Sequence, residues 1–136
     1  MQGASALQDT LTDLQGSPLL VLIVWEPVLW SDLGPPASSV LSIVSDKRAV
    51  QFWDEDRSLS RFMVQSATED LSILAPGDSV TPDTIVWDFV AVFPPGASWS
   101  AHPRPSYYGG PVVDVIDQVR SRLSGSTPPA ARSLRP

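Results

Sequence analysis

The stretch Leu19-Leu20-Val21-Leu22-Ile23-Val24-Trp25 decides the fold that we predict for this chain. Seven consecutive apolar residues are too few to span a membrane. Because they include two valines and an isoleucine, they favour a strand that is buried on both faces, as in the middle of a parallel or mixed sheet. The polar break at Glu26-Pro27 marks the carboxyl end of this strand, where open α/β sheets usually place their binding sites.

The rest of the sequence predicts neighbours for this strand and helices to cover it. Alternation at 49–53 predicts a second strand, the apolar run 84–93 a third, and a short fourth strand is expected near 98–101. Asp88, which interrupts the third run, is interpreted as a structural hydrogen-bond acceptor. The short connection through a helix makes the first two strands parallel, as in a right-handed βαβ unit. Helical spacing of apolar residues is found at 37–45, at 59–63 and, most clearly, at 112–123.

The composition of the chain limits what it can do. Its 136 residues suffice for one domain with a core, and its net charge of −6 argues against nucleic acid or an anionic membrane surface as the main partner. The absence of cysteine excludes disulfides, thiolate metal sites, cysteine nucleophiles and dithiol redox chemistry. Residues 1–16 contain no basic residue and no apolar core of signal-peptide length, so we expect no targeting segment, and the compartment stays open. No cofactor is indicated.

The order strand, helix, strand, helix, strand, strand, helix resembles that of the thioredoxin-like fold. Trp25-Glu26-Pro27 follows the first strand, where thioredoxins carry their Trp-Cys-Gly-Pro-Cys motif. Thr81-Pro82 precedes the third strand, where the family places a cis-proline, and Gly109-Gly110 precedes the closing helix. Trp53-Asp54 after the second strand is similar to a pair in uncharacterised, cysteine-poor thioredoxin-like proteins of bacteria. The resemblance implies a three-layer α/β/α sandwich around a mixed four-stranded sheet, but without the two cysteines it implies no dithiol activity.

The resemblance also divides the chain into three parts. Residues 18–124 form the predicted thioredoxin-like domain. Residues 1–17 form an N-terminal extension whose weak helical spacing predicts either a short amphipathic helix lying on the domain or a frayed end. Residues 125–136 are rich in proline and serine, and we expect a disordered tail or a linker.

Candidate site residues gather where the strands of this topology end. The first two strands end, and the third begins, at the same edge, so Trp25-Glu26, Trp53-Asp54-Glu55-Asp56 and Pro82-Asp83 are expected to converge. Two tryptophans beside several carboxylates suit a sugar or cation site, or a hard metal held by oxygen ligands. The alternative interpretation makes Asp54 and Asp56 helix caps and the tryptophans part of the core, with Glu26 exposed at the start of a loop.

Three functional hypotheses follow. The favoured one is a non-catalytic thioredoxin-like module that binds a protein or peptide at this aromatic, proline-bearing face. The second is a cysteine-independent enzyme, or a metal or sugar site, that uses Glu26 with Asp54 or Asp56. The third is a structural subunit or homodimer. The candidate binding residues are Trp25, Glu26, Pro27, Trp30, Trp53, Asp54, Asp56 and Pro82.

Overall fold

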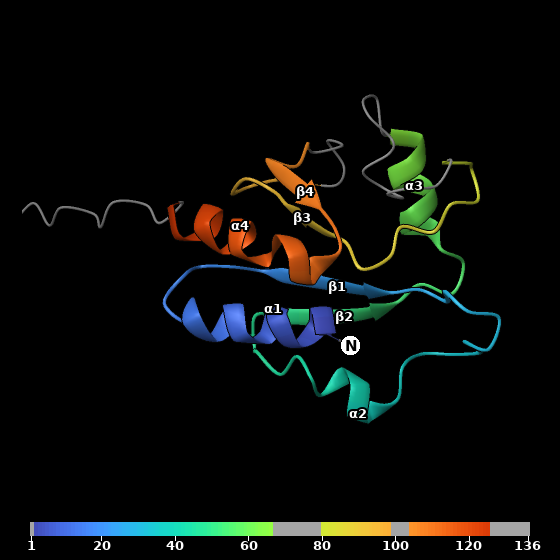
Figure 1. The fold of residues 1–136 in the computed structure, drawn as a ribbon, viewed down its shortest axis with the longest axis horizontal. Helices are drawn as coiled ribbons and strands as arrows, with labels where there is room; N and C mark the ends of the chain where they lie inside the picture. The colour runs from blue at the N-terminus through green and yellow to red at the C-terminus, as the bar shows by residue number, and fades with distance from the viewer. Residues whose placement is uncertain (1, 67–79, 99–103, 126–136) are drawn as a thin grey trace, which may run out of the picture.

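A computed structural model describes residues 2–66, 80–98 and 104–125, and the structural statements below concern these residues. They form a mixed arrangement of helices and short strands (Figure 1). No helix in these ranges is long and apolar enough to cross a membrane. In chain order the elements are α1 (Gln2–Asp13), β1 (Val21–Trp25), α2 (Ser38–Leu41), β2 (Ala49–Trp53), α3 (Ser58–Ser66), β3 (Val90–Val92), β4 (Tyr107–Gly109) and α4 (Val112–Gly125).

The first two strands pair as the sequence predicts. β1 and β2 are parallel, with a register that runs from Val21 opposite Ala49 to Trp25 opposite Trp53. Of the apolar run that predicts β1, the strand itself takes the last five residues. The parallel pairing is therefore confirmed, and both strands end at the same edge of the sheet.

The third and fourth strands differ from the prediction. β3 and β4 are three residues each and pair with one another, antiparallel, so the described residues hold two two-stranded sheets in place of one four-stranded sheet. The predicted third strand is shortened: β3 begins only at Val90, after Asp88, whose φ of 50° is left-handed and departs from strand geometry. The predicted fourth strand near 98–101 lies largely outside the described residues, and β4 forms later in the chain, at Tyr107–Gly109.

The helices follow the predicted periodicity with one exception. α4 and α3 form where apolar spacing places them, whereas the helix predicted over 37–45 is reduced to the four residues of α2. Residues 2–13 form the helix α1, and the tail 126–136 lies outside the described residues. α1 and α4 pack side by side in front of the strands (Figure 1). The buried apolar residues of the core are Leu11, Leu14, Val44, Ile116 and Val119.

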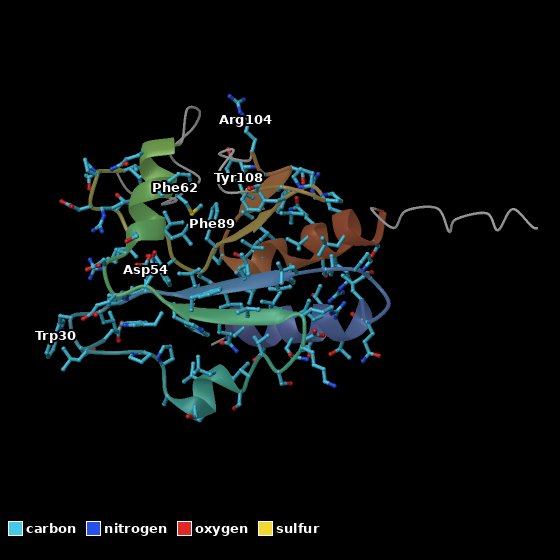
Figure 2. All side chains as sticks on the ribbon, turned by 180° about the vertical axis from the view of Figure 1, so that it is seen from behind. Trp30, Asp54, Phe62, Phe89, Arg104 and Tyr108 are labelled. Atoms are coloured by element: carbon cyan, nitrogen blue, oxygen red, sulfur yellow. The ribbon has the colours of Figure 1, made fainter. Side chains whose placement is uncertain are left out.

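Among the described residues, no helix covers one face of the β1–β2 sheet, contrary to the expectation that β1 is buried on both faces. Seen from behind, the two strands lie in front of α1 (Figure 2). Leu22 is 47% exposed, and its neighbours on β2, Val50 and Phe52, are 43% and 49% exposed. Leu20, directly before β1, is 72% exposed. Gln51 alternates onto the opposite face, where its side chain bonds to the carbonyls of Leu41 and Val44.

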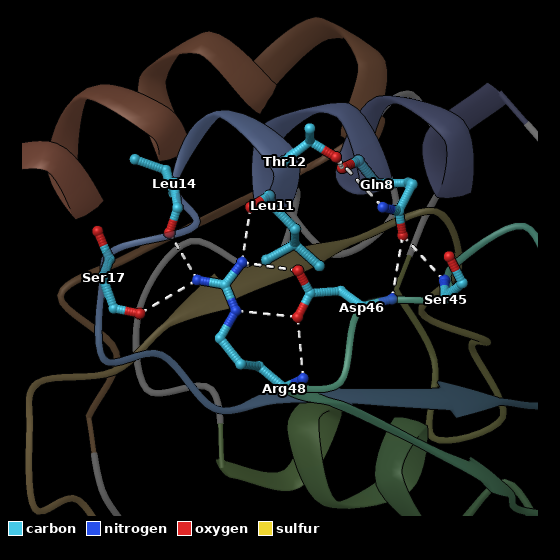
Figure 3. A network of polar contacts seen from close by, with 8 residues as sticks. All are labelled: Gln8, Leu11, Thr12, Leu14, Ser17, Ser45, Asp46 and Arg48. Carbon is cyan, nitrogen blue, oxygen red and sulfur yellow. Dashed lines mark hydrogen bonds and ion pairs between the residues drawn. The ribbon is translucent and has the colours of Figure 1, made fainter.

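The start of β2 is joined to the end of α1 by Arg48 (Figure 3). Its guanidinium donates to the carbonyl oxygens of Leu11 (2.6 Å), Leu14 (2.6 Å) and Ser17 (3.1 Å). It also forms a two-point ion pair with the Asp46 carboxylate, at 2.9 and 2.7 Å. Because the last carbonyls of a helix have no partner inside the helix, Arg48 acts as a C-terminal cap for α1 supplied by another element.

Candidate functional site

The site begins where β1 and β2 end together. Trp25 and Trp53 are register partners, and the Asp54 N–H donates to the Trp25 carbonyl at 2.8 Å, which extends the pairing by one residue. Both tryptophans are partly buried. The predicted convergence of Trp25-Glu26 with Trp53-Asp54 is thus found.

The Trp25 indole takes part in a structural hydrogen-bond chain. Its Nε1–H donates to the Gln51 side-chain oxygen at 2.9 Å. The Gln51 amide in turn donates to the carbonyls of Leu41 and Val44 at 2.9 and 3.0 Å. Gln51 therefore ties the sheet to the end of α2 and the segment after it, and the indole N–H of Trp25 is engaged inside the sheet.

Glu26 is bound to the first turn of α3 rather than exposed in a loop. Its Oε1 accepts the Ser60 backbone N–H at 3.0 Å, and its Oε2 accepts the Ser60 hydroxyl at 2.5 Å. Ser60 is 2% exposed, and its Oγ also accepts the backbone N–H of Val86 at 2.9 Å. One buried serine thus connects the end of β1, the start of α3 and the segment that leads to β3.

Asp54 caps the same helix, as the structural interpretation expected. Its Oδ2 accepts the Leu59 N–H at 2.8 Å, and the Arg57 N–H donates to the Asp54 carbonyl at 3.2 Å. Partial burial tends to raise the pKa of Asp54, but hydrogen bonds from the Leu59 and Ser58 N–H groups, and from the Ser58 side chain, lower it below its usual value. Asp54 and Glu26 therefore both accept hydrogen bonds from the first turn of α3, at its positive end.

Sequence reasoning did not single out Ser60. The sequence nevertheless contains a signal for a buried serine at this position. Ser60 lies between Leu59 and Phe62, whose apolar spacing indicates the inward side of α3. A buried hydroxyl on such a face needs partners. Glu26, at the end of a buried strand, is the partner that the fold supplies.

Two of the predicted residues do not join this cluster. Asp56 is exposed in the turn between β2 and α3. Pro82 is exposed in a turn in which the Thr84 N–H donates to the Thr81 carbonyl at 3.0 Å. The cis peptide found among the described residues is Gly110–Pro111, not Thr81–Pro82. The chain after Pro82 reaches the cluster through the Val86 N–H.

The loop that leaves β1 displays apolar side chains to solvent. We call residues 28–33 the apolar loop. Trp30 is 93% exposed, Leu33 92% and Leu29 60%. Trp30 projects from one end of the molecule (Figure 2). Pro27, at the root of the loop, is partly buried.

The apolar loop is nevertheless ordered by hydrogen bonds of its own. The Asp32 Oδ2 accepts the N–H groups of Val28 and Leu29 at 3.0 and 2.8 Å. The Asp32 N–H donates back to the Leu29 carbonyl at 3.0 Å, and the Leu33 N–H to the Ser31 carbonyl at 3.0 Å. A single carboxylate therefore folds the loop into a compact turn while its apolar side chains point outward.

The polar groups of this region do not form a metal site. Within residues 2–66, 80–98 and 104–125, no cluster of three or more aspartate, glutamate or histidine side chains is arranged to hold an ion. Glu26 and Asp54 bind the start of α3.

No family model, no curated protein and no solved structure matches this chain.

Proposed function

We propose that this chain is a non-catalytic, thioredoxin-like module that binds a protein or peptide through the apolar loop, residues 28–33. The observation that carries the proposal is the combination of order and exposure in this loop. Trp30 and Leu33 are more than nine-tenths exposed, while the backbone beneath them is fixed by the Asp32 carboxylate. Tryptophan is the residue type most enriched at binding hot spots, and an ordered loop loses less entropy on binding than a flexible one.

The position of the loop supports the same proposal. It follows the carboxyl end of β1, which is where open α/β sheets place their sites, and where thioredoxins, by the resemblance drawn above, carry their redox motif. The order of the elements from β1 to α4 supports a thioredoxin-like ancestry, with a redox scaffold that has lost its cysteines. The two small sheets of the described residues differ from the single four-stranded sheet of the thioredoxin-like fold.

The carboxylates have a structural part in this proposal. Both oxygens of Glu26 accept hydrogen bonds from Ser60, and Asp54 accepts the N–H groups of the first turn of α3. Acceptors that are already engaged with the helix are poor candidates for a general base or for a ligand of a metal ion. A reaction that uses Glu26 with Asp54 or Asp56 is thus less well supported than binding.

The test compares two exposed tryptophans. A photoreactive amino acid placed at Leu29 identifies the protein or peptide that contacts the loop in cells, and calorimetry with that purified partner measures the affinity. Trp30→Ala is expected to weaken binding at least tenfold, whereas Trp87→Ala, which removes a tryptophan that is 67% exposed outside the loop, leaves it unchanged. Equal losses in both variants, or none in Trp30→Ala, would reject the loop as the contact.

A further inference from the structure

Exposed apolar side chains are concentrated on one part of the molecule. Of the ten large apolar side chains that are exposed among the described residues, eight belong to β1, β2, Leu20 or the apolar loop. Four of these eight, Leu20, Leu22, Val50 and Phe52, belong to the sheet rather than to the loop. With Val24 they form what we call the uncovered face. This face is a second apolar surface, separate from the one proposed above to bind a partner.

A parallel sheet with one open face is an incomplete structure. Parallel strands occur almost only where both faces are covered. α1 packs against α4, and no helix of the described residues is drawn across the near side of the two strands in Figure 2. Leu22 and Val50 are register partners in the middle of the uncovered face, each more than two-fifths exposed. Contiguous apolar surface of this kind on a soluble chain marks a contact with another surface.

We propose that the uncovered face is the contact between two copies of this chain, packed sheet against sheet across a two-fold axis. In such a dimer each residue lies near its own copy, so a charged side chain at the centre would meet a like charge. The uncovered face satisfies this requirement, because all five of its side chains are neutral and apolar. Arg48 and Asp54, the charged residues that flank β2 at its two ends, are engaged with α1 and α3 instead.

The size of the face fits the centre of a dimer contact. Each partner in a standard interface contributes about 800 Å², of which the core is apolar and the rim polar. Four side chains that are 43–72% exposed supply an apolar core of a few hundred Å², and two packed sheets separated by about 10 Å bring the polar rim around them into contact as well. The apolar loop stays at the periphery and is left for another partner.

The net charge predicts how this dimer responds to salt. Each copy carries −6, so the approach of two copies is opposed by long-range repulsion. Salt screens this repulsion and does not weaken an apolar contact. Sedimentation equilibrium of the full chain is therefore expected to show a two-chain mass, with a dissociation constant that falls several-fold between about 50 and 500 mM NaCl.

Substitutions on the two apolar surfaces separate this proposal from the preceding one. Phe52→Glu and Leu20→Glu are each expected to give a folded monomer, judged by circular dichroism and sedimentation. Leu33→Glu, on the apolar loop, is expected to leave the dimer intact. A wild-type chain that is monomeric at 200 µM, or a Phe52→Glu dimer as tight as wild type, would overturn the dimer and leave the proposed function of the loop untouched.

The absence of cysteine supplies a test that does not depend on the stability of a charged variant. Leu22→Cys, at the centre of the face, is expected to give a disulfide-linked dimer under mild oxidation at micromolar concentration. Leu33→Cys, which is more exposed, is expected to remain largely unlinked. Faster linkage of Leu33→Cys than of Leu22→Cys would contradict the sheet-to-sheet arrangement.

Discussion

Arg48 and Asp46 form a two-point ion pair that aims the rest of the guanidinium at the end of α1. Asp46 also accepts the Arg48 backbone N–H at 2.9 Å, so one carboxylate fixes both the turn before β2 and the direction of the arginine side chain. Through this pair the segment that begins β2 is joined to the Leu11 carbonyl of α1 and to the Leu14 and Ser17 carbonyls just after the helix. The junction links α1 to the start of β2 by polar contacts.

We expect Arg48→Met to destabilise the protein by about 2–4 kcal/mol, because it removes the guanidinium donor from the carbonyls of Leu11, Leu14 and Ser17 and leaves the Asp46 carboxylate without its ion pair. The Leu14 and Ser17 carbonyls keep one backbone N–H donor each. Arg48→Lys is expected to lower the free energy of unfolding by a smaller amount, since lysine keeps the positive charge. Some loss is still expected, because an ammonium group cannot bind Asp46 and the carbonyls at the same time as a guanidinium does. Urea unfolding followed by tryptophan fluorescence measures both. Arg61→Met, at an exposed position on α3, is the control and should change the free energy of unfolding by less than about 0.5 kcal/mol. Equal effects at the two arginines would contradict the capping role.

The same pair predicts a dependence of stability on acid pH. The hydrogen bonds from the Arg48 side chain, and then from its backbone N–H, lower the pKa of Asp46 to about 2. Because the pKa is lower in the folded chain than in the unfolded chain, the stabilisation is complete above about pH 4 and is lost as the pH falls toward 2. The thermal midpoint of wild type should therefore fall more steeply over this window than that of Asp46→Asn. Parallel curves for the two proteins would exclude the ion pair as a source of the dependence.

Removal of the Ser60 hydroxyl oxygen is expected to lower the stability of the protein strongly. Ser60→Ala leaves the Val86 N–H without its acceptor and takes a donor from Glu26, so we expect a loss of about 2–4 kcal/mol in the free energy of unfolding. Ser121→Ala removes a hydroxyl that donates to the Asp117 carbonyl on the surface of α4, and serves as the matched control. Its effect should stay within about 0.5 kcal/mol. Retention of full stability in Ser60→Ala would remove the basis for calling the cluster structural.

Gly110 lies where two backbone segments approach closely. A methyl group on its Cα would come within 2.6 Å of the Asp88 carbonyl oxygen, which belongs to backbone and cannot swing away. Gly110→Ala is therefore expected to destabilise the protein by about 1–3 kcal/mol. Gly34, whose added methyl group would meet nothing within 4 Å, is the control. Thermal unfolding of the two variants compares them directly, and equal midpoints would show that the approach relaxes without penalty.

Local patterns in the sequence predicted the elements that depend on local physics. The apolar run before Glu26 gave β1, alternation gave β2, and the 3.6-residue spacing after Pro111 gave α4. The placement of Asp54 as a cap followed from its position between a strand and a helix. Each of these depends on residues close together in the chain, and that is why sequence alone was enough.

The prediction of the sheet was wrong where a single residue decides the path of the backbone. Nothing in the run 84–93 shows that Asp88 adopts a positive φ, since its neighbours Trp87 and Phe89 favour a strand. The coverage of β1 on both faces was expected because seven apolar residues in a row are typical of a central strand. Coverage, however, depends on where distant elements pack, and here α1 packs against α4 while Leu22 on β1 stays 47% exposed. The roles of Arg48 and Ser60 depend on partners more than 25 residues away along the chain.

The Asp32 carboxylate predicts an effect that can be measured without a known partner. It accepts the N–H groups of Val28 and Leu29, which otherwise lie in an exposed loop and would exchange rapidly with solvent. Asp32→Ala is expected to speed exchange of these two amides at least tenfold, while the free energy of unfolding changes by less than about 1 kcal/mol. Asp32→Asn keeps an acceptor oxygen, so its exchange rates should lie between those of wild type and of Asp32→Ala.

Because a loosened loop has to be ordered again on binding, Asp32→Ala should also weaken the contact made by Trp30, even though Trp30 itself is unchanged. Unaltered exchange in Asp32→Ala would mean that the loop is held by something other than this carboxylate, and the argument from order to binding would fail with it.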